Sequence, residues 1–275
     1  MTFANTHHRT LYKAAIALNN TAVTLIERQQ YKDAVETFRL SISAIHSVIE
    51  ESRNPSRAEE FVASSCITEI TRHLYEASQR CAQLCIANHD ADARTTPSNE
   101  SDENVIVVKF SSQQCAISVL DTIYQASRGG TAQVYTCVVI EVVDQDESLF
   151  ESIGEVCNSI MYNFGVAHSV LACQFNASMK SDQVLIEELQ KRAFKLLRLI
   201  EPFFLAKLAW SPNEFHDRGV LLLCLLFAQA MSTVTYHLHY TALWESYKDT
   251  LRAILASIDA QETLIPTLNR HAAMA

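Results

Sequence analysis

Apolar residues recur at steps of three and four along most of the chain, which is the period of a helix packed on one side. The pattern is clearest in residues 9–27, and residues 31–49 repeat it. A short polar stretch, residues 28–30, separates the two segments. We therefore expect two helices that pack as antiparallel neighbours.

The same period predicts further helices beyond this pair. Asn54 and Pro55 suit a helix start, because Asn caps the N-terminus and Pro fits the first turn. Pro202 and Pro212 are expected to bracket a junction between helices, and residues 259–275, which include Pro266, to form a loose C-terminal tail. The expected helices span residues 55–88, 148–178, 182–201, 213–238 and 240–258.

Two β-branched runs interrupt the helical pattern. Residues 105–108 and 134–143 have the composition that strands favour, and Gly129-Gly130 can turn between them. We expect an inserted β-hairpin within residues 104–143. The intervening stretch 115–126 fits a strand or a short helix, and the sequence leaves both open.

The net charge of −9 belongs to one part of the chain. Residues 88–155 hold twelve acidic and three basic side chains, whereas the charges balance before and after this segment. A nucleic-acid partner needs a basic surface, so we expect none, and no anionic membrane surface either. The acidic loop and hairpin insert, residues 88–147, suits a basic protein or peptide partner. The alternative is a solvated loop that keeps the chain soluble.

Apolar content predicts a buried core and no membrane span. Hydrophobic residues make up 48% of the 275-residue chain, and Gly and Pro number only five each, which favours long helices. The most apolar run, residues 219–231, is shorter than the ~20 residues that a spanning helix needs. The N-terminus lacks the apolar segment of a secretory signal, and eight cysteines are scattered through apolar stretches. We expect reduced thiols and an intracellular location, cytoplasmic or nuclear.

The stretch LNNTAVTLIERQQYKDAVETFRLSIS, residues 18–43, resembles the tetratricopeptide repeat (TPR), a unit of two antiparallel helices. Ala22 and Ala34 take the small positions at which the two helices cross. Tyr31 and Phe38 take the aromatic positions that fill the space beside the crossing. The alternative is an ordinary helical hairpin in an unrelated bundle.

The resemblance recurs less completely along the chain. In residues 161–172 Asn163 matches Asn20 and Gly165 matches Ala22, while Ala193, the small residue expected at the second crossing, arrives about 16 residues late. Residues 222–257 resemble a third pair without the aromatic residues. The resemblance implies a mainly α fold: TPR-like antiparallel helix pairs in a short right-handed array, forming a single domain over residues 1–275 with an inserted β-hairpin.

The resemblance also implies a function, because TPR arrays bind peptides or helices in a concave groove lined by the first helix of each pair. A carboxylate clamp of Lys and Asn, found in some TPR proteins, is absent, since its positions hold Asn19 with Val23 and Tyr162 with Val166. We expect a non-catalytic scaffold that binds a protein or peptide. The expected groove residues are Asn19, Asn20, Val23, Ile26 and Glu27, followed by Tyr162, Asn163, Val166 and Ser169.

The alternative function is an enzyme or small-ligand carrier with a pocket between the insert and helices 148–201. It would use His168, Cys157 or the acidic cluster, although no hydrolase, zinc-protease or phosphate-loop motif occurs. We expect no cofactor and no metal. The four candidate ligands Cys66, His73, Cys81 and Cys85 share one expected helix, and a single helix rarely supplies more than two ligands.

One basic helix face carries two open interpretations. Lys191, Lys195 and Arg198 recur at helical steps, and Glu187 precedes Lys191 by four residues in the order that favours an ion pair. The face could dock the acidic insert, in the same chain or from a second chain. Alternatively it is a solvated helix surface.

Overall fold

The computed structural model describes residues 2–53, 105–111, 133–140, 149–177, 182–209 and 218–254. The expected helix 55–88, the open stretch 115–126, the acidic residues 90–103 and the tail 259–275 lie outside the described residues. The chain is mainly helical, as expected. Its elements are α1 (Thr2–Glu27), α2 (Tyr31–Arg53), β1 (Val105–Ser111), β2 (Gln133–Val139), α6 (Leu149–Ala177), α7 (Gln183–Ala209), α8 (Arg218–His237) and a helix over residues 241–254.

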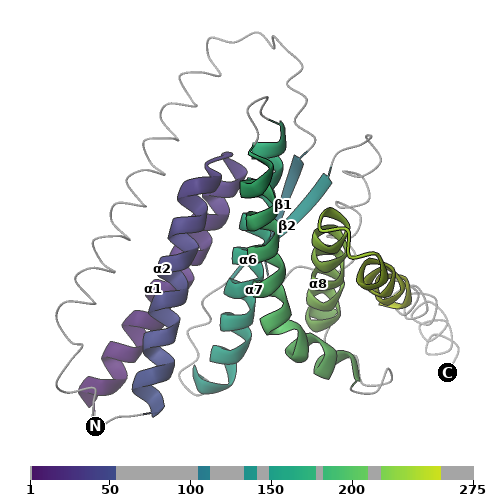
Figure 1. Ribbon diagram of the computed structural model, residues 1–275. Coiled ribbons are helices and arrows are strands. Elements are labelled where there is room, and N and C mark those ends of the chain that lie inside the picture. Colours follow the sequence, from purple (N-terminus) through teal and green to yellow (C-terminus); the bar gives the residue numbers. More distant parts are fainter. Residues whose placement is uncertain are drawn as a thin grey trace, which may run out of the picture.

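The described helices pack as three antiparallel pairs that lie side by side (Figure 1). The pairs are α1 with α2, α6 with α7, and α8 with the helix 241–254. Each pair also contacts the next, because α2 packs on α6 and α7 packs on α8. β2 packs on α6 and α1, and β1 contacts α1.

Small residues allow the helices of a pair to approach closely. Ala22 and Ala34 are completely buried where α1 and α2 pack. In the second pair, a Cβ atom added to Gly165 would lie 3.0 Å from the Leu197 side chain and 3.6 Å from the Ala193 carbonyl oxygen. This confirms that Gly165 and Ala193 meet at the α6–α7 crossing, and it explains why a larger residue would force the helices apart.

The first and third pairs turn in the same way. Gln29 lies two residues after the end of α1, and His239 lies two residues after the end of α8. Both take a left-handed backbone conformation, with φ of 60° and 58°. Each turn is closed by the two hydrogen bonds of a Schellman cap. After α1, the Gln30 N–H donates to the Leu25 carbonyl at 2.9 Å and the Gln29 N–H to the Ile26 carbonyl at 2.9 Å. After α8, the Tyr240 N–H donates to the Thr235 carbonyl at 2.9 Å and the His239 N–H to the Tyr236 carbonyl at 3.0 Å.

The expected β-hairpin is wrong, although both strands are present. β1 and β2 pair in parallel, with Val105 opposite Gln133 and Ser111 opposite Val139. A hairpin requires antiparallel neighbours joined by a tight turn, whereas parallel strands require a crossover. The 21 residues between Ser111 and Gln133 are long enough for that crossover.

The expected end of the helix 182–201 at residue 201 is also wrong, because α7 continues through Pro202 to Ala209. Proline inside a helix removes one backbone hydrogen bond and costs about 3 kcal/mol. Burial of the next turn offsets this cost, since Phe204 is 2% exposed and stacks on Phe227 of α8 at 4.5 Å. α7 bends towards its C-terminal end (Figure 1), as expected at a proline.

Candidate functional site

Strand β2 lies along α1 and α6, and both of its backbone edges form hydrogen bonds. One edge pairs with β1. In a strand, the N–H and C=O groups of alternate residues face the same edge. The other edge therefore presents the backbone groups of Thr136, Val138 and Ile140, and the first helices of the pairs bind these groups through side chains.

Asn163 of α6 binds Val138 in two ways. Its Nδ2 donates to the Val138 carbonyl at 2.8 Å, and its Oδ1 accepts from the Val138 N–H at 2.8 Å. A primary amide thus reproduces the donor and acceptor that a neighbouring strand would offer. Asn163 is completely buried, so these bonds form out of contact with water.

Asn20 of α1 repeats the arrangement one step along the strand. Its Nδ2 donates to the Ile140 carbonyl at 2.8 Å, and its Oδ1 accepts from the Ile140 N–H at 3.0 Å. Asn20 and Asn163 are the residues that the sequence comparison aligned between the two helix pairs. Equivalent asparagines of successive pairs therefore bind residues two apart on β2.

Asn19 joins the two asparagines into one network. It donates to the Val138 carbonyl at 3.2 Å and to Asn20 Oδ1 at 3.1 Å, and it accepts from Asn163 Nδ2 at 2.9 Å. Among the described residues, no fully buried side-chain nitrogen or oxygen lacks a hydrogen-bond partner. We name this network, Asn19, Asn20 and Asn163, the asparagine ladder.

The third helix pair has no asparagine at the corresponding place. Ala230 lies nine residues before His239, as Asn20 lies nine residues before Gln29. The next residue on this edge of β2, Thr136, is bound by Tyr162 of α6 instead. The Tyr162 hydroxyl donates to the Thr136 carbonyl at 3.2 Å and shares a hydrogen bond with Thr136 Oγ1 at 3.0 Å. The ladder thus continues along β2 with a different side chain.

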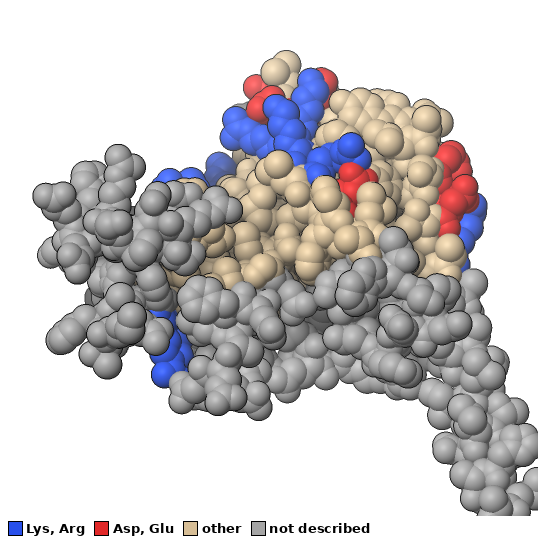
Figure 2. Space-filling view, turned by 90° about the horizontal axis from the view of Figure 1, so that it is seen from below, with Lys and Arg blue, Asp and Glu red and all other residues tan. Residues whose placement is uncertain are grey.

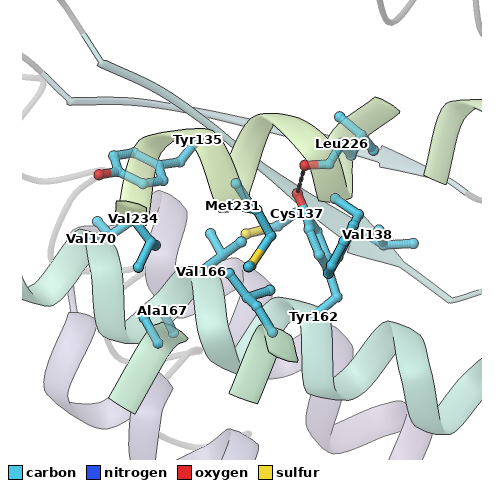
Figure 3. Close-up of a cluster of buried hydrophobic side chains, with 14 of the residues drawn as sticks. Tyr135, Cys137, Val138, Tyr162, Val166, Ala167, Val170, Leu226, Met231 and Val234 are labelled. Atoms are coloured by element: carbon cyan, nitrogen blue, oxygen red, sulfur yellow. Dashed lines mark hydrogen bonds between the residues drawn. The ribbon is translucent and has the colours of Figure 1, made fainter. Parts of the chain in front are cut away.

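The side chains of β2 fill the space between α6 and α8. Figure 3 shows Cys137 and Val138 directed into a cluster with Val166, Tyr162 and Met231. Cys137 and Val138 are completely buried. Burial raises the pKa of the Cys137 thiol, so the reactive thiolate form is suppressed. These residues pack as core.

A second polar chain leads from β2 towards the surface. The Tyr135 hydroxyl lies 3.1 Å from Cys173 Sγ and 3.4 Å from Ser169 Oγ, and Ser169 donates to Gln190 Oε1 at 3.1 Å. Burial raises the pKa of Tyr135, which keeps the hydroxyl protonated. Gln190 forms part of the floor of a cleft of about 410 Å³ where α6, α7 and the turn after α8 meet.

The structure brings most of the expected groove residues together beneath β2. Seven of them are buried, Asn20 is half-buried and Glu27 is exposed. These residues therefore lie against the chain's own strand rather than against an open surface. The sequence does not reveal this contact, although the run of residues 134–140 is apolar on both faces, as a strand buried on both sides requires.

His168 and Cys157, the candidates for an enzyme site, lie in packed surroundings. His168 is 4% exposed, its Nδ1 lies 2.9 Å from the Phe164 carbonyl, and its ring meets the Phe164 ring edge-on. Burial lowers the pKa of His168 and raises the pKa of Cys157. Neither residue lines the 410 Å³ cleft.

The basic face of α7 carries local ion pairs. Lys191 lies 2.7 Å from Glu187, and Arg198 pairs with Glu201. Lys195 is exposed. Seen from below, the described surface is mostly uncharged, and Lys and Arg side chains gather at its margins beside Asp and Glu side chains (Figure 2). The exposed Lys191–Glu187 pair contributes little to stability, whereas Glu201 is buried.

In the part of the chain that the structure describes, no three His, Cys, Asp or Glu side chains lie together as a metal site requires. Cys137, Cys157, Cys173 and Cys224 form no disulfide bond with one another, while the other four cysteines and His73 lie outside that part. Within these described residues, no helix is both long and apolar enough to cross a bilayer.

Comparison of the chain with protein-family models, with curated proteins and with solved structures found no match.

Proposed function

We propose that this chain is a non-catalytic protein–protein interaction scaffold of TPR-like build that binds a protein or peptide. The observation that carries the proposal is the double hydrogen bonding of Val138 by Asn163 and of Ile140 by Asn20. Helix-borne amides that bind backbone groups at successive alternate residues form a device for holding extended polypeptide. Such contacts do not depend on the side chains of the bound segment.

The arrangement of helix pairs supports a TPR-like array. α1, α6 and α8, the first helices of the three pairs, would line the inner face, and the small residues Ala22, Ala34, Gly165 and Ala193 would permit the close crossings. The recurrence of the α1–α2 turn after α8 favours a repeated unit over an unrelated bundle. In this interpretation β2 occupies the place of a peptide in the groove.

The partner's chemistry follows from the charge distribution. The net charge of −9 arises within residues 88–155, so a basic protein or peptide would be attracted to this part of the chain, and nucleic acid would be repelled. Because β2 fills the groove, a partner reaches the asparagine ladder only where β2 is displaced. First contact therefore takes place on another surface.

The groove can be tested by supplying its strand as a separate peptide. Val138→Pro removes the N–H that Asn163 binds and should release β2 from the groove. A fluorescent peptide with the sequence of residues 133–140, QVYTCVVI, should then bind the variant and should bind the unmodified chain at least about tenfold more weakly. Adding Asn163→Ala to the variant should abolish peptide binding.

Circular dichroism checks that the variant keeps its helices. Ile140→Pro, which disturbs only the end of the strand, serves as a milder variant. Absence of peptide binding by a folded variant would reject the groove as a polypeptide-binding device. Affinity purification of the full chain, followed by direct binding of the purified candidate partner, tests the scaffold function itself. Failure of every candidate to bind directly would count against that function.

A further inference from the structure

A cleft at one end of the helical pairs lies apart from the groove filled by β2. It has a volume of about 410 Å³, within the range of ligand-binding sites. The last turns of α6, the first turns of α7 and the turn after α8 form its walls. Its lining includes three side-chain amides and two tyrosines: Asn176, Gln183, Gln190, Tyr236 and Tyr240.

Gln190 has a hydrogen-bonding group that no other described residue uses. The residue is 3% exposed, and its one side-chain hydrogen bond to a described residue is the 3.1 Å contact with Ser169. A primary amide can donate twice and accept twice. Since no fully buried side-chain polar atom of the described residues is unpaired, the remaining amide atom of Gln190 reaches the cleft surface. Whichever way the amide is turned, one polar atom faces the cleft.

Exposed apolar side chains gather around the same cleft. Tyr236 and Tyr240 line it and are 57% and 39% exposed. Val184, 77% exposed, follows the lining residue Gln183, and Leu243 lies one helical turn beyond Tyr240. These are four of the seven large hydrophobic residues that are exposed in the described part of the chain. Exposed apolar patches of this kind mark interaction sites.

Aromatic contacts hold the rim in place. The Tyr236 ring lies 5.5 Å from the Trp244 ring, and the Tyr240 ring meets Phe194 edge-on at 5.4 Å. Rigid aromatic residues are the side chains that most often anchor a protein partner. Bound side chains would find an apolar surface that is already ordered.

The cleft offers no excess of charge to select a charged ligand. Glu187, which lines it, pairs with Lys191 at 2.7 Å. Asp182 caps α7, accepting from the Val184 and Leu185 N–H groups at 3.0 and 3.3 Å. An uncharged ligand with a hydrogen-bond acceptor fits this lining best.

We propose that the cleft binds a short, uncharged, apolar segment of a partner protein, with a backbone carbonyl of that segment accepting from the Gln190 amide. The apolar rim extends beyond the cleft, so a small molecule would leave it exposed whereas a polypeptide covers it. The asparagine ladder shows that this chain already binds backbone groups through amides. The inference rests on the proposed scaffold function and supplies the open surface that the filled groove lacks.

The test uses a phage-displayed library of random linear peptides, selected on the full chain. The tightest peptides are synthesised, and their dissociation constants are measured by fluorescence anisotropy. Val184→Ser and Tyr236→Ser, both at exposed positions, should each weaken binding about tenfold. Leu199→Ser, an equally exposed apolar position on α7 and far from the lining residues, is the matched control and should leave binding unchanged.

Each other outcome has a defined meaning. Peptides that bind all three variants equally, but lose affinity when β2 or the asparagine ladder is altered, would overturn the cleft and leave the scaffold function standing. If selection yields no peptide and no protein partner binds directly, both proposals fail. If the chain self-associates in sedimentation and Val184→Ser abolishes this, a second copy occupies the cleft and the partner proposal is wrong.

Discussion

The asparagine ladder and the cleft both contain a primary amide, but the two amides differ in how many hydrogen bonds they make. In the groove, the Asn163 amide is completely buried and makes three hydrogen bonds, two to Val138 and one to Asn19. In the cleft, the Gln190 amide makes one, to Ser169. A saturated, buried amide stabilises the fold, whereas an amide with an unused atom at a surface can bind something else. This difference in hydrogen bonding distinguishes the asparagine ladder, which stabilises the fold, from the cleft, which remains open to a ligand.

The largest expected effect is that of removing the Asn163 amide. Asn163→Ala leaves both backbone groups of Val138 and the Asn19 oxygen without this partner, in a place that water does not reach. Unpaired buried groups cost about 1–3 kcal/mol each, partly relieved by rearrangement, so we expect a loss of about 3–5 kcal/mol of unfolding free energy. Urea denaturation measures it.

Asn20→Ala is the internal control for that prediction. Asn20 makes the equivalent contacts with Ile140 but is only half-buried, so water can replace part of its bonding. We expect a smaller loss of about 1–2 kcal/mol. Equal losses at the two positions would contradict the claim that burial makes the Asn163 contacts structural.

Alkaline pH should lower the free energy of unfolding through Tyr135 and Tyr162. Burial raises the pKa of Tyr135 and of Tyr162, so both hydroxyls stay protonated in the folded chain above pH ~10, where unfolded tyrosines ionise. Their contribution is fully present below about pH 10 and is lost above it, by about 1.4 kcal/mol per pH unit for each group. Chemical denaturation at several pH values measures the loss. The dependence should become shallower in Tyr162→Phe, and an unchanged slope would argue against this account.

Gln190→Leu should cost far less than Asn163→Ala. It removes one hydrogen bond, to Ser169, and fills a similar volume with an apolar side chain. We expect a loss of about 1 kcal/mol in urea denaturation. A loss as large as that of Asn163→Ala would mean that the Gln190 amide is as essential to the fold as the ladder, and the contrast between the two sites would fail.

The sequence predicted the local part of the fold because local patterns determine it. Helical periodicity placed the pairs, and alignment of Asn163 with Asn20 identified two residues that turn out to do the same task. The β-branched run at residues 134–143 correctly predicted a strand. Each of these features depends on residues close together in the chain.

The direction of strand pairing and the contacts of β2 with α1 and α6 depend on distant residues, so local sequence patterns do not reveal them. The direction in which β1 and β2 pair is decided by the path of the intervening chain, and no periodicity reports that path. Asn20 and Ile140 are 120 residues apart, and nothing near either residue indicates their contact. Pro202 was misinterpreted for a similar reason, because the stacking of Phe204 on Phe227 comes from another helix.

The smallest expected effect compares the two turns that share one geometry. Gln29 and His239 hold left-handed conformations, which cost a residue with a side chain about 1–2 kcal/mol, while glycine avoids that cost but loses about 0.5–1 kcal/mol of chain entropy. Gln29→Gly and His239→Gly should therefore each raise the unfolding free energy by about 0.5 kcal/mol, seen as a small increase in urea midpoint.

His239 lines the cleft and Gln29 does not. If the two variants gain stability equally but only His239→Gly changes peptide affinity, the turn is a common structural unit and the cleft alone is the binding surface. Unequal gains would show that the matching hydrogen bonds do not reflect matching energetics.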